Sequence, residues 1–313
     1  MKHPQHLCEN KFKVSVIGCG NVGATAAFTM LLEGSPTELV LIDAVKDRAQ
    51  GLLMDFEHTL SFVPYTALTA SDKLSATADS NLIVVTAGAR QKEGQSRLDL
   101  INENKKIFDK IIPELAKNSP EAILLIISNP VDILTHHALK VSKFPANRVF
   151  GSGTMLDSIR LQYHISRKLK VNPRDVRAFI LGEHGDSSFP IWNSANIAGK
   201  SLFKFPKFTQ KIADKCYDDT KNAAYRIIHD MGYTCYSIAV VVREIMSAIF
   251  QDAQIVVPLS VELKGEYGLR DVVLSIPCVL GAHGVIEKIE IPLNAKEKKQ
   301  LQNSAKLLKQ YSK

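Results

Sequence analysis

One of the nine histidines stands in a setting that favours proton transfer. His184 lies in Gly182-Glu183-His184-Gly185-Asp186-Ser187, among glycines at the end of an apolar stretch that predicts a strand. An imidazole titrates near neutral pH and can therefore take up and return a proton during a reaction. Three other histidines lie in helical patterns, and the pair His136-His137 lacks metal-ligand spacing with any cysteine or acidic cluster. We therefore expect His184 to be catalytic and expect no metal site.

A carboxylate and a guanidinium form a second candidate pair. Asp157 and Arg160 are three residues apart in a helix predicted near residues 154–169, so they lie on one face and one turn apart. A surface ion pair and a functional pair both have this spacing. The residues alone leave these two interpretations open.

A glycine-rich turn predicts a dinucleotide site. Gly18-Cys19-Gly20-Asn21-Val22-Gly23 fits the pattern G-x-G-x-x-G, directly after a predicted strand and at the start of a predicted helix. The first glycine permits the tight turn, the second lets the backbone approach a pyrophosphate, and the third lets the helix pack on the strand. The N-terminus of the helix would receive the phosphates.

Asp43 supports the same interpretation. It ends the second predicted strand, twenty residues after Gly23, where a carboxylate can accept hydrogen bonds from an adenosine ribose. Because Asp43 would repel the additional phosphate of NADP, we expect NAD as the cofactor. Arg48, a turn further on, weakens this preference slightly.

The elements that carry these residues alternate between strand and helix in the first half of the chain. Nearly continuous Val, Ile and Leu are typical of parallel strands buried on both faces. Such runs predict strands at 13–17, 38–42, 81–85, 122–127 and 148–150, with helices at about 21–33, 101–117 and 131–141. We expect an α/β fold with a Rossmann-type doubly wound parallel sheet, in which ligands lie beyond the carboxyl ends of the strands.

The second half has an α+β pattern. Helices are predicted near 154–169, 207–229 and 233–250, and strands near 176–182, 253–263, 271–280 and 284–291. The boundary lies near Gly151-Ser152-Gly153. We expect a NAD-binding domain at 1–152 and a catalytic, substrate-binding domain at 153–313, with a cleft between them.

Composition narrows the class of protein. The 313 residues are 45% hydrophobic and 23% charged, which excludes a disordered or fibrous chain. No apolar stretch reaches the roughly 18 residues that span a bilayer, and the first residues lack the apolar run of a signal peptide. We therefore expect a cytoplasmic protein that does not contact a membrane. Five scattered cysteines without a C-x-x-C pair predict reduced thiols that serve packing.

The formal net charge of +7 raises the question of nucleic-acid binding. Positively charged residues are most concentrated near the C-terminus. There, Leu301, Ala305 and Leu308 recur at helical spacing among lysines. An amphipathic helix with a solvated basic face explains this pattern better than a phosphate-binding arm. We expect no nucleic-acid partner.

In their order along the chain, these motifs resemble those of the L-lactate and malate dehydrogenase family. The likeness covers the chain from about residue 12 to the C-terminal helix. It rests on Gly18 to Gly23, Asp43, Thr86-Ala87-Gly88-Ala89-Arg90-Gln91, Ser96-Arg97-Leu98, Ser128-Asn129-Pro130, Asp157 with Arg160, Gly182 to Ser187, and Gly232-Tyr233-Thr234.

The resemblance implies NADH-dependent, reversible reduction of pyruvate to L-lactate. His184 would exchange the hydroxyl proton of lactate, and Asp157 would hold the imidazole and stabilise its charge. Arg160 would bind the substrate carboxylate with its planar fork, and Arg97 would polarise the carbonyl. Asn129 would donate a hydrogen bond to the substrate oxygen.

The resemblance also assigns the loop from Ala89 to Leu100 and the cofactor contacts. The loop would be a lid that carries Arg97 and closes over the substrate, and an ordinary surface loop is its alternative. The expected cofactor contacts are Gly18, Gly20, Asn21, Val22, Gly23, Asp43, Arg48, Gly88, Ala89, Ser128, Asn129 and Ser152.

Within the family, Gln91 favours lactate over malate. Malate-type members have an arginine here that neutralises the second carboxylate of oxaloacetate, whereas Gln91 is neutral. Thr234 would line the same side and suit a small methyl group. Malate dehydrogenase is the alternative, followed by a non-catalytic NAD-binding protein on the same fold, because a fold alone does not establish activity.

Two further expectations concern assembly and regulation. The family implies a homo-oligomer, with a tetramer favoured over a dimer. Similar bacterial enzymes activated by fructose 1,6-bisphosphate have an arginine and a histidine where this chain has Gln162 and Arg177. A neutral amide removes one cation per subunit, so we expect weak or absent activation.

Overall fold

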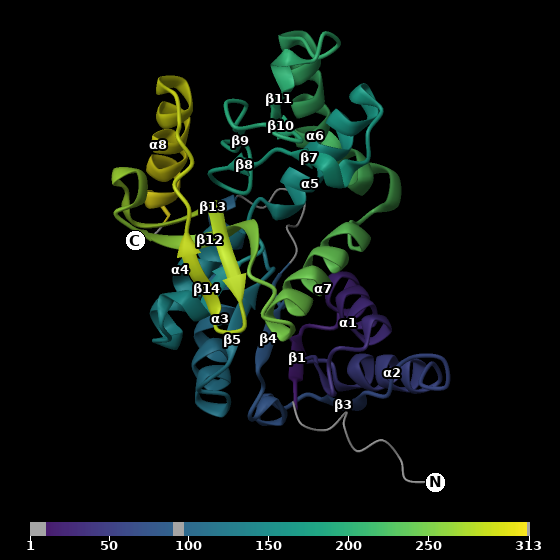
Figure 1. Ribbon diagram of the computed structural model, residues 1–313. Coiled ribbons are helices and arrows are strands. Elements are labelled where there is room, and N and C mark those ends of the chain that lie inside the picture. Colours follow the sequence, from purple (N-terminus) through teal and green to yellow (C-terminus); the bar gives the residue numbers. More distant parts are fainter. Residues whose placement is uncertain (1–10, 90–96, 312–313) are drawn as a thin grey trace.

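The computed structural model describes residues 11–89 and 97–311. Its centre is a sheet with the strand order β14-β13-β12-β6-β5-β4-β1-β2-β3 (Figure 1). These strands are β1 Lys13–Ile17, β2 Glu38–Ile42, β3 Ala67–Ser71, β4 Leu82–Val85, β5 Ile123–Ile126, β6 Val149–Gly151, β12 Ile255–Lys264, β13 Arg270–Gly281 and β14 Gly284–Lys288. From β3 to β6 the strands pair in parallel, whereas β12, β13 and β14 are antiparallel.

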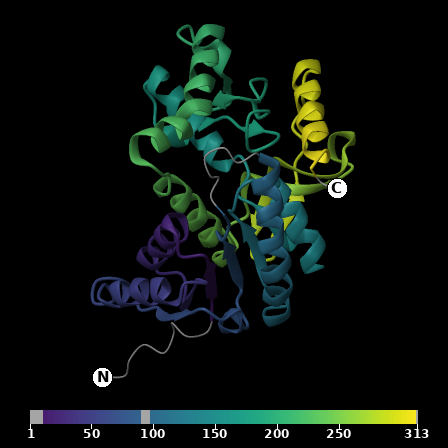
Figure 2. The same cartoon turned by 180° about the vertical axis from the view of Figure 1, so that it is seen from behind.

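Helices cover both faces of the parallel strands, which explains why these strands are apolar throughout. On β4, Leu82 and Val84 pack on the side of α1 and α7, whereas Ile83 and Val85 pack on the side of α3 and α4. Figures 1 and 2 show helices on both faces of the parallel strands, seen from two opposite sides. The helices are α1 Asn21–Glu33, α2 Lys46–Glu57, α3 Arg97–Asn118, α4 Val131–Ser142 and α7 Tyr236–Phe250. The predicted Rossmann-type parallel sheet is thus confirmed.

Two elements of the first half were not predicted, α2 and β3. In α2 only Ala49 and Phe56 are buried, so its apolar pattern is weak. Strand β3 lies at the edge of the sheet, pairs only with β2, and has no fully buried residue. Elements with little buried surface leave little periodicity in a sequence.

The second half supplies small sheets and helices above the carboxyl ends of the parallel strands in Figure 1. The strand predicted at 176–182 is wrong as one element, because β7 pairs with β10 whereas β8 pairs with β9. The remaining α-helices and strands are α5 Met155–Leu169, β7 Val176–Arg177, β8 Ile180–Leu181, β9 Phe189–Pro190, β10 Asn196–Ile197, β11 Lys200–Ser201, α6 Gln210–Met231 and α8 Ala295–Lys309.

The antiparallel strands extend the parallel sheet through a single junction. Gly151 of β6 pairs with Ser260 of β12. A β-carbon on Gly151 would lie 2.6 Å from Val131 Cγ2 and 2.7 Å from Thr135 Oγ1. The main sheet therefore contains strands from both halves of the chain, and only glycine fits where they meet.

The C-terminal helix α8 has the expected amphipathic pattern. It buries Leu301, Ala305 and Leu308, while its lysines at 296, 298, 299, 306 and 309 are exposed. Among the residues described, no helix is long and apolar enough to cross a membrane. Cys19, Cys216, Cys235 and Cys278 are free and buried, and Cys8 lies outside the described residues.

Candidate active site

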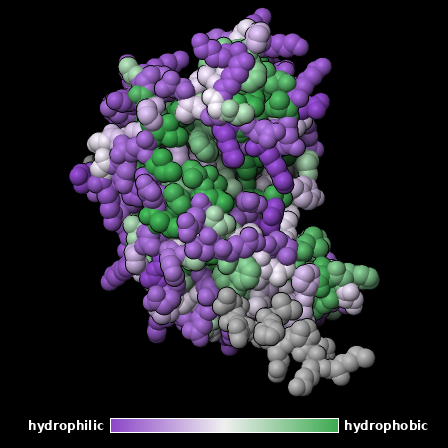
Figure 3. Space-filling model, viewed as in Figure 1, coloured by the Kyte–Doolittle hydropathy of each residue, from purple (hydrophilic) through white to green (hydrophobic). Residues whose placement is uncertain are grey.

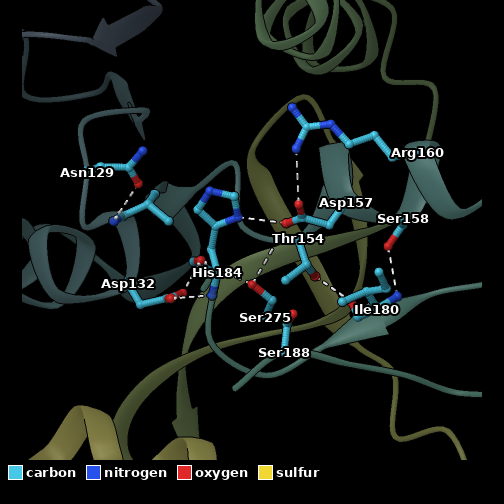
Figure 4. Close-up of polar contacts among 12 residues, drawn as sticks. Asn129, Asp132, Thr154, Asp157, Ser158, Arg160, Ile180, His184, Ser188 and Ser275 are labelled. Atoms are coloured by element: carbon cyan, nitrogen blue, oxygen red, sulfur yellow. Dashed lines mark hydrogen bonds and ion pairs between the residues drawn. The ribbon is translucent and has the colours of Figure 1, made fainter. Parts of the chain in front are cut away.

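His184, Asp157 and Arg160 come together from two separate segments of the chain. His184 follows β8, whereas Asp157 and Arg160 lie in the first two turns of α5. Imidazole Nδ1 lies 2.7 Å from Asp157 Oδ2, and Arg160 Nη1 donates to Asp157 Oδ1 over 3.4 Å (Figure 4). The three side chains are 27%, 16% and 12% exposed, respectively. Asp157 and Arg160 therefore belong to a largely buried cluster and are not a surface ion pair.

The charges of this cluster set its protonation. Burial lowers the pKa of His184, but the Asp157 carboxylate and its hydrogen bond, together with Asp132, raise it from 6.5 to about 9. Burial would raise the pKa of Asp157, and His184 and Arg160 outweigh this effect and hold it below its usual 3.8. His184 is thus protonated at neutral pH, whereas the sequence predicted an imidazole that titrates near neutrality.

Two groups of the cluster remain available for a ligand. The second ring nitrogen of His184 points away from Asp157 in Figure 4. In the described part of the chain, the guanidinium of Arg160 makes no hydrogen bond other than that to Asp157. Burial lowers the pKa of Arg160, and Asp157 opposes this shift. The cluster therefore presents a proton donor and a cation that retains hydrogen-bond donors.

Asp132 fixes the backbone of His184. It lies in the first turn of α4, is 3% exposed, and accepts a 2.7 Å hydrogen bond from the N–H of His184 at Oδ2. Its Oδ1 accepts a hydrogen bond from Ser260 Oγ. Burial raises the pKa of Asp132 to about 6 in spite of these hydrogen bonds. Asp132 thus holds the loop that carries the imidazole, and its charge also raises the pKa of His184.

A chain of hydroxyl groups continues from Asp132 to the start of α5. Ser260 Oγ lies 3.2 Å from Ser275 Oγ. Ser275 Oγ accepts a hydrogen bond from the N–H of Thr154 (Figure 4). Because Ser260 donates its proton to Asp132, Ser275 must donate to Ser260. Every donor in the chain is directed toward the buried carboxylate. The chain therefore links the loop of the imidazole to the helix that carries its carboxylate partner.

Two helices hold the far end of the same loop. Tyr217 of α6 donates to the carbonyl oxygen of Ser188, and Ser304 of α8 donates to that of Ser187 over 2.8 Å. Lys221 of α6 donates to the carbonyl oxygen of Asp186 over 3.0 Å. Together with Asp132 of α4, these contacts anchor the backbone of the segment 182–188 to three helices.

The glycine-rich turn lies between β1 and α1 and has the shape that its sequence predicted. Gly18 has φ +96°, and a β-carbon on Gly23 would lie 1.8 Å from Gly18 O. In contrast, a β-carbon on Gly20 would meet nothing within 4 Å. The first turn of α1 has neither a side-chain cap nor an acidic residue. The turn thus leaves open space beside unpaired N–H groups, which fits a pyrophosphate.

The other expected cofactor residues lie along the same edge of the sheet. Asp43 follows β2, is 7% exposed, and accepts 2.8 Å hydrogen bonds from the N–H groups of Cys19 and Val45. Arg48 Nη1 lies 3.3 Å from Asp43 Oδ2. The remaining residues follow successive strands: Gly88 and Ala89 after β4, Ser128 and Asn129 after β5, and Ser152 after β6. These residues fit a dinucleotide that extends across the carboxyl ends of the strands.

Comparison with known proteins decides the family. Residues 12–151 match the model of the lactate/malate dehydrogenase NAD-binding domain, and residues 154–313 match that of the lactate/malate dehydrogenase alpha/beta C-terminal domain. The chain belongs to the lactate/malate dehydrogenase family. It is 43% identical over 303 residues to L-lactate dehydrogenase 1 of Clostridium acetobutylicum, which covers 95% of this chain and 96% of that protein. It is 41% identical to an L-lactate dehydrogenase of Clostridium botulinum, strain Loch Maree, over 96% of both chains.

Two solved structures share the fold over nearly the whole chain. A minor L-lactate dehydrogenase from Enterococcus mundtii, in a ligand-bound form, superposes with a TM-score of 0.94 at 35% identity. A lactate dehydrogenase from a Medee basin deep-sea metagenome library has a TM-score of 0.93 at 38% identity. Each likeness covers 96% of this chain and 98% of the other.

The described side chains do not include two of the family residues expected at the site, Gln91 and Arg97. Gln91 lies outside the described residues. Arg97 opens α3, so the predicted loop at 89–100 is wrong at its end, where residues from Arg97 onward are helical. Thr234 is half-buried between α6 and α7, and no described hydrogen bond ties it to His184. In the described ranges, no three His, Cys, Asp or Glu side chains are grouped to hold a metal ion.

Two buried polar residues of the family fold were missed from the sequence. Asn104 is fully buried, accepts from the N–H of Ala89 over 2.7 Å, and donates to the carbonyl oxygen of Asn129 over 3.0 Å. It interrupts the buried stripe that includes Ile101 and Phe108. A polar residue at such a position is the available signal for a buried hydrogen-bonding role, and Asp132, at the start of an apolar helix, has the same signal.

We expect Asp157→Asn to lower the pKa of His184 below 6.5, because burial then outweighs the remaining charges. The raised pKa of the native imidazole stabilises the fold below about pH 6.5, and this stabilisation is lost as the pH rises through about 9. The variant should lack this pH-dependent part of the free energy of unfolding. NMR titration of the imidazole and denaturant unfolding from pH 6 to 10 measure both effects.

Asp109→Asn is the matched control, since Asp109 lies 2.7 Å from His137 in a pair outside the site. It should leave the titration of His184 unchanged. A His184 pKa that stays near 9 in Asp157→Asn would contradict the electrostatic account of the cluster.

Proposed function

We propose that this chain is an NAD-dependent L-lactate dehydrogenase that reduces pyruvate to L-lactate with NADH and catalyses the reverse reaction. The observation that carries the proposal is the buried cluster of His184, Asp157 and Arg160, which combines a protonated imidazole with a carboxylate-binding cation. Full-length relatives named L-lactate dehydrogenases, at 41% and 43% identity, support the same activity. Pyruvate and lactate are the substrates of this proposal.

The protein's own groups supply proton transfer and binding. NADH, when bound, supplies the hydride, and NAD accepts it in the reverse direction. During reduction, His184 donates its proton to the carbonyl oxygen of pyruvate and becomes neutral, and during oxidation it removes the hydroxyl proton of lactate. Asp157 stabilises the imidazolium form, while Arg160 binds the carboxylate and orients the reacting carbon.

Further substrate contacts are part of the proposal. Asn129 would donate to the substrate oxygen, and Arg97 would polarise the carbonyl bond. Gln91 and Thr234 would line the side of the substrate methyl group. Arg97, at the start of α3, would be carried on the lid that excludes water.

The same proposal assigns the cofactor site and the domains. The glycine-rich turn would bind the pyrophosphate of NAD, and Asp43 would bind the adenosine ribose. Residues 1–152 would form the NAD-binding domain and residues 153–313 the catalytic domain, with the substrate between them. A malate dehydrogenase is the alternative, and the neutral Gln91 argues against it.

Assembly as a homotetramer is also proposed. Large apolar side chains are exposed on α1 (Phe28, Leu32), on α2 (Met54) and after α2, where Phe62 is 90% exposed. Figure 3 shows apolar side chains gathered over α1 and α2 on the right-hand side. An exposed apolar patch of this kind favours burial against another copy of the chain.

The first test of the proposed activity compares substrates. We expect NADH oxidation with pyruvate to have a much higher kcat/KM than with oxaloacetate, because a second carboxylate would lie beside the neutral Gln91. Gln91→Arg should raise kcat/KM for oxaloacetate and lower it for pyruvate. Gln95→Arg, four residues later in the same segment, is the control for an added charge. If wild type prefers oxaloacetate, the chain is a malate dehydrogenase.

The second test concerns the acid. His184→Ala should retain NADH binding and lose at least about 100-fold in kcat, the usual scale for a general acid or base. His164→Ala removes a histidine of α5 outside the cluster and should retain turnover. Arg160→Leu should instead raise the KM for pyruvate most, because a carboxylate would enter a site without its cation. Near-wild-type turnover in His184→Ala would exclude the proposed acid.

The third test concerns activation. Gln162 donates its amide N–H to the carbonyl oxygen of Ala178 over 3.1 Å, and Arg177 is exposed on β7. Since one cation per subunit is replaced by this amide, fructose 1,6-bisphosphate should change the KM for pyruvate little. Initial rates with and without millimolar activator, and light scattering under both conditions, measure activation and assembly. A large fall in KM, or a tetramer only with activator, would refute this expectation.

A further inference from the structure

Arg48 is hydrogen-bonded to the carboxylate of Asp43, which is expected to select the cofactor. Its Nη1 lies 3.4 Å from Asp43 Oδ1 and 3.3 Å from Asp43 Oδ2. The same two oxygens each accept one backbone hydrogen bond, Oδ1 from Val45 and Oδ2 from Cys19. Each carboxylate oxygen offers about two acceptor positions. Arg48 therefore holds the positions that a ribose hydroxyl group would need.

The side chain of Asp43 is fixed, whereas that of Arg48 is exposed and only loosely bound. Asp43 is 7% exposed and fixed by two backbone N–H groups at 2.8 Å, so its carboxylate cannot turn away. The side chain of Arg48 is 53% exposed and reaches Asp43 through one nitrogen at long distance. Ion pairs with so exposed a partner contribute little to stability. Arg48 can therefore leave Asp43 at small cost.

Both charges also act on the glycine-rich turn. The pKa of Cys19, whose N–H is bound to Asp43, is raised to about 12, mainly by burial and further by Asp43, and Arg48 opposes this rise. Arg48 thus lies within electrostatic reach of the turn expected to bind phosphate. It offsets part of the negative potential that Asp43 creates there.

We propose that Arg48 is a specificity-determining residue that reduces discrimination against an adenosine 2′-phosphate. When the bound cofactor has a free ribose hydroxyl group, Arg48 moves away from Asp43, and the hydroxyl group donates a hydrogen bond to the carboxylate in its place. Next to a 2′-phosphate, its guanidinium turns from Asp43 to the phosphate and offsets the repulsion by that carboxylate. NADH remains the preferred cofactor, but its preference over NADPH is smaller than Asp43 alone would produce. This inference rests on the proposed function only in assuming that the turn binds the adenosine half of NAD.

The test uses adenosine fragments, so that it does not depend on turnover. Isothermal titration calorimetry with adenosine 2′,5′-bisphosphate and with 5′-AMP gives the ratio of their affinities. In Arg48→Gln this ratio should fall roughly tenfold relative to wild type, because the phosphate loses its cation. The affinity for 5′-AMP should stay equal or rise, since Asp43 is released. The effect should weaken at high salt.

Lys46→Gln is the matched control, because Lys46 is an exposed cation in the same first turn of α2. Its affinity ratio should equal that of wild type. An unchanged ratio in Arg48→Gln would overturn the proposal, and so would an equal fall in Lys46→Gln, which would indicate general attraction by positive charge. Pyruvate reduction by wild type with NADH is measured in parallel, so failure of the proposed activity is distinguished from failure of this inference.

Discussion

The site depends on one constraint: three ionised groups, a carboxylate, an imidazolium and a guanidinium, are removed from water together. Each ion loses hydration worth about several kcal/mol, and their mutual attraction must offset that loss. Asp157 makes this possible because its two oxygens bind different partners, His184 on one and Arg160 on the other. The geometry of the cluster cannot relax far without leaving a buried charge unpaired. Rigid support for each member follows from this requirement.

The surrounding polar network supplies that support. Asp132 fixes the backbone of His184, and the hydroxyl groups of Ser260 and Ser275 connect it to the residue before α5. Two elements that are distant in sequence are thereby held at hydrogen-bonding distance. The second buried carboxylate also adds to the pKa shift of His184. Positioning and electrostatics are therefore served by the same residues.

The elements of the fold that could be predicted from the sequence were those that bury many residues. The central strands, the glycine-rich turn and the setting of His184 were predicted, because apolar runs and glycines report directly on the backbone. The edge strand β3 and the helix α2 were missed because they bury few residues. The hydrogen bond between His184 and Asp157 joins segments 27 residues apart, so only the resemblance to a family suggested it. The partners of Asp132 lie 52 and 128 residues away, and no local pattern encodes such contacts.

The junction of Gly151 and Ser260 has a consequence for how the chain can be divided. A fragment that ends at Gly151 would retain the glycine-rich turn but expose β6 as a bare strand edge, where unpaired N–H and C=O groups invite association with other chains. It would also uncover the side of α1 against which α7 packs, where Thr29 donates to the carbonyl oxygen of Ala239. The cofactor-binding half is thus one continuous stretch of sequence, but part of its surface is covered by the second half. We therefore expect a fragment that ends at Gly151 to associate with other chains through this edge instead of behaving as a smaller nucleotide-binding protein.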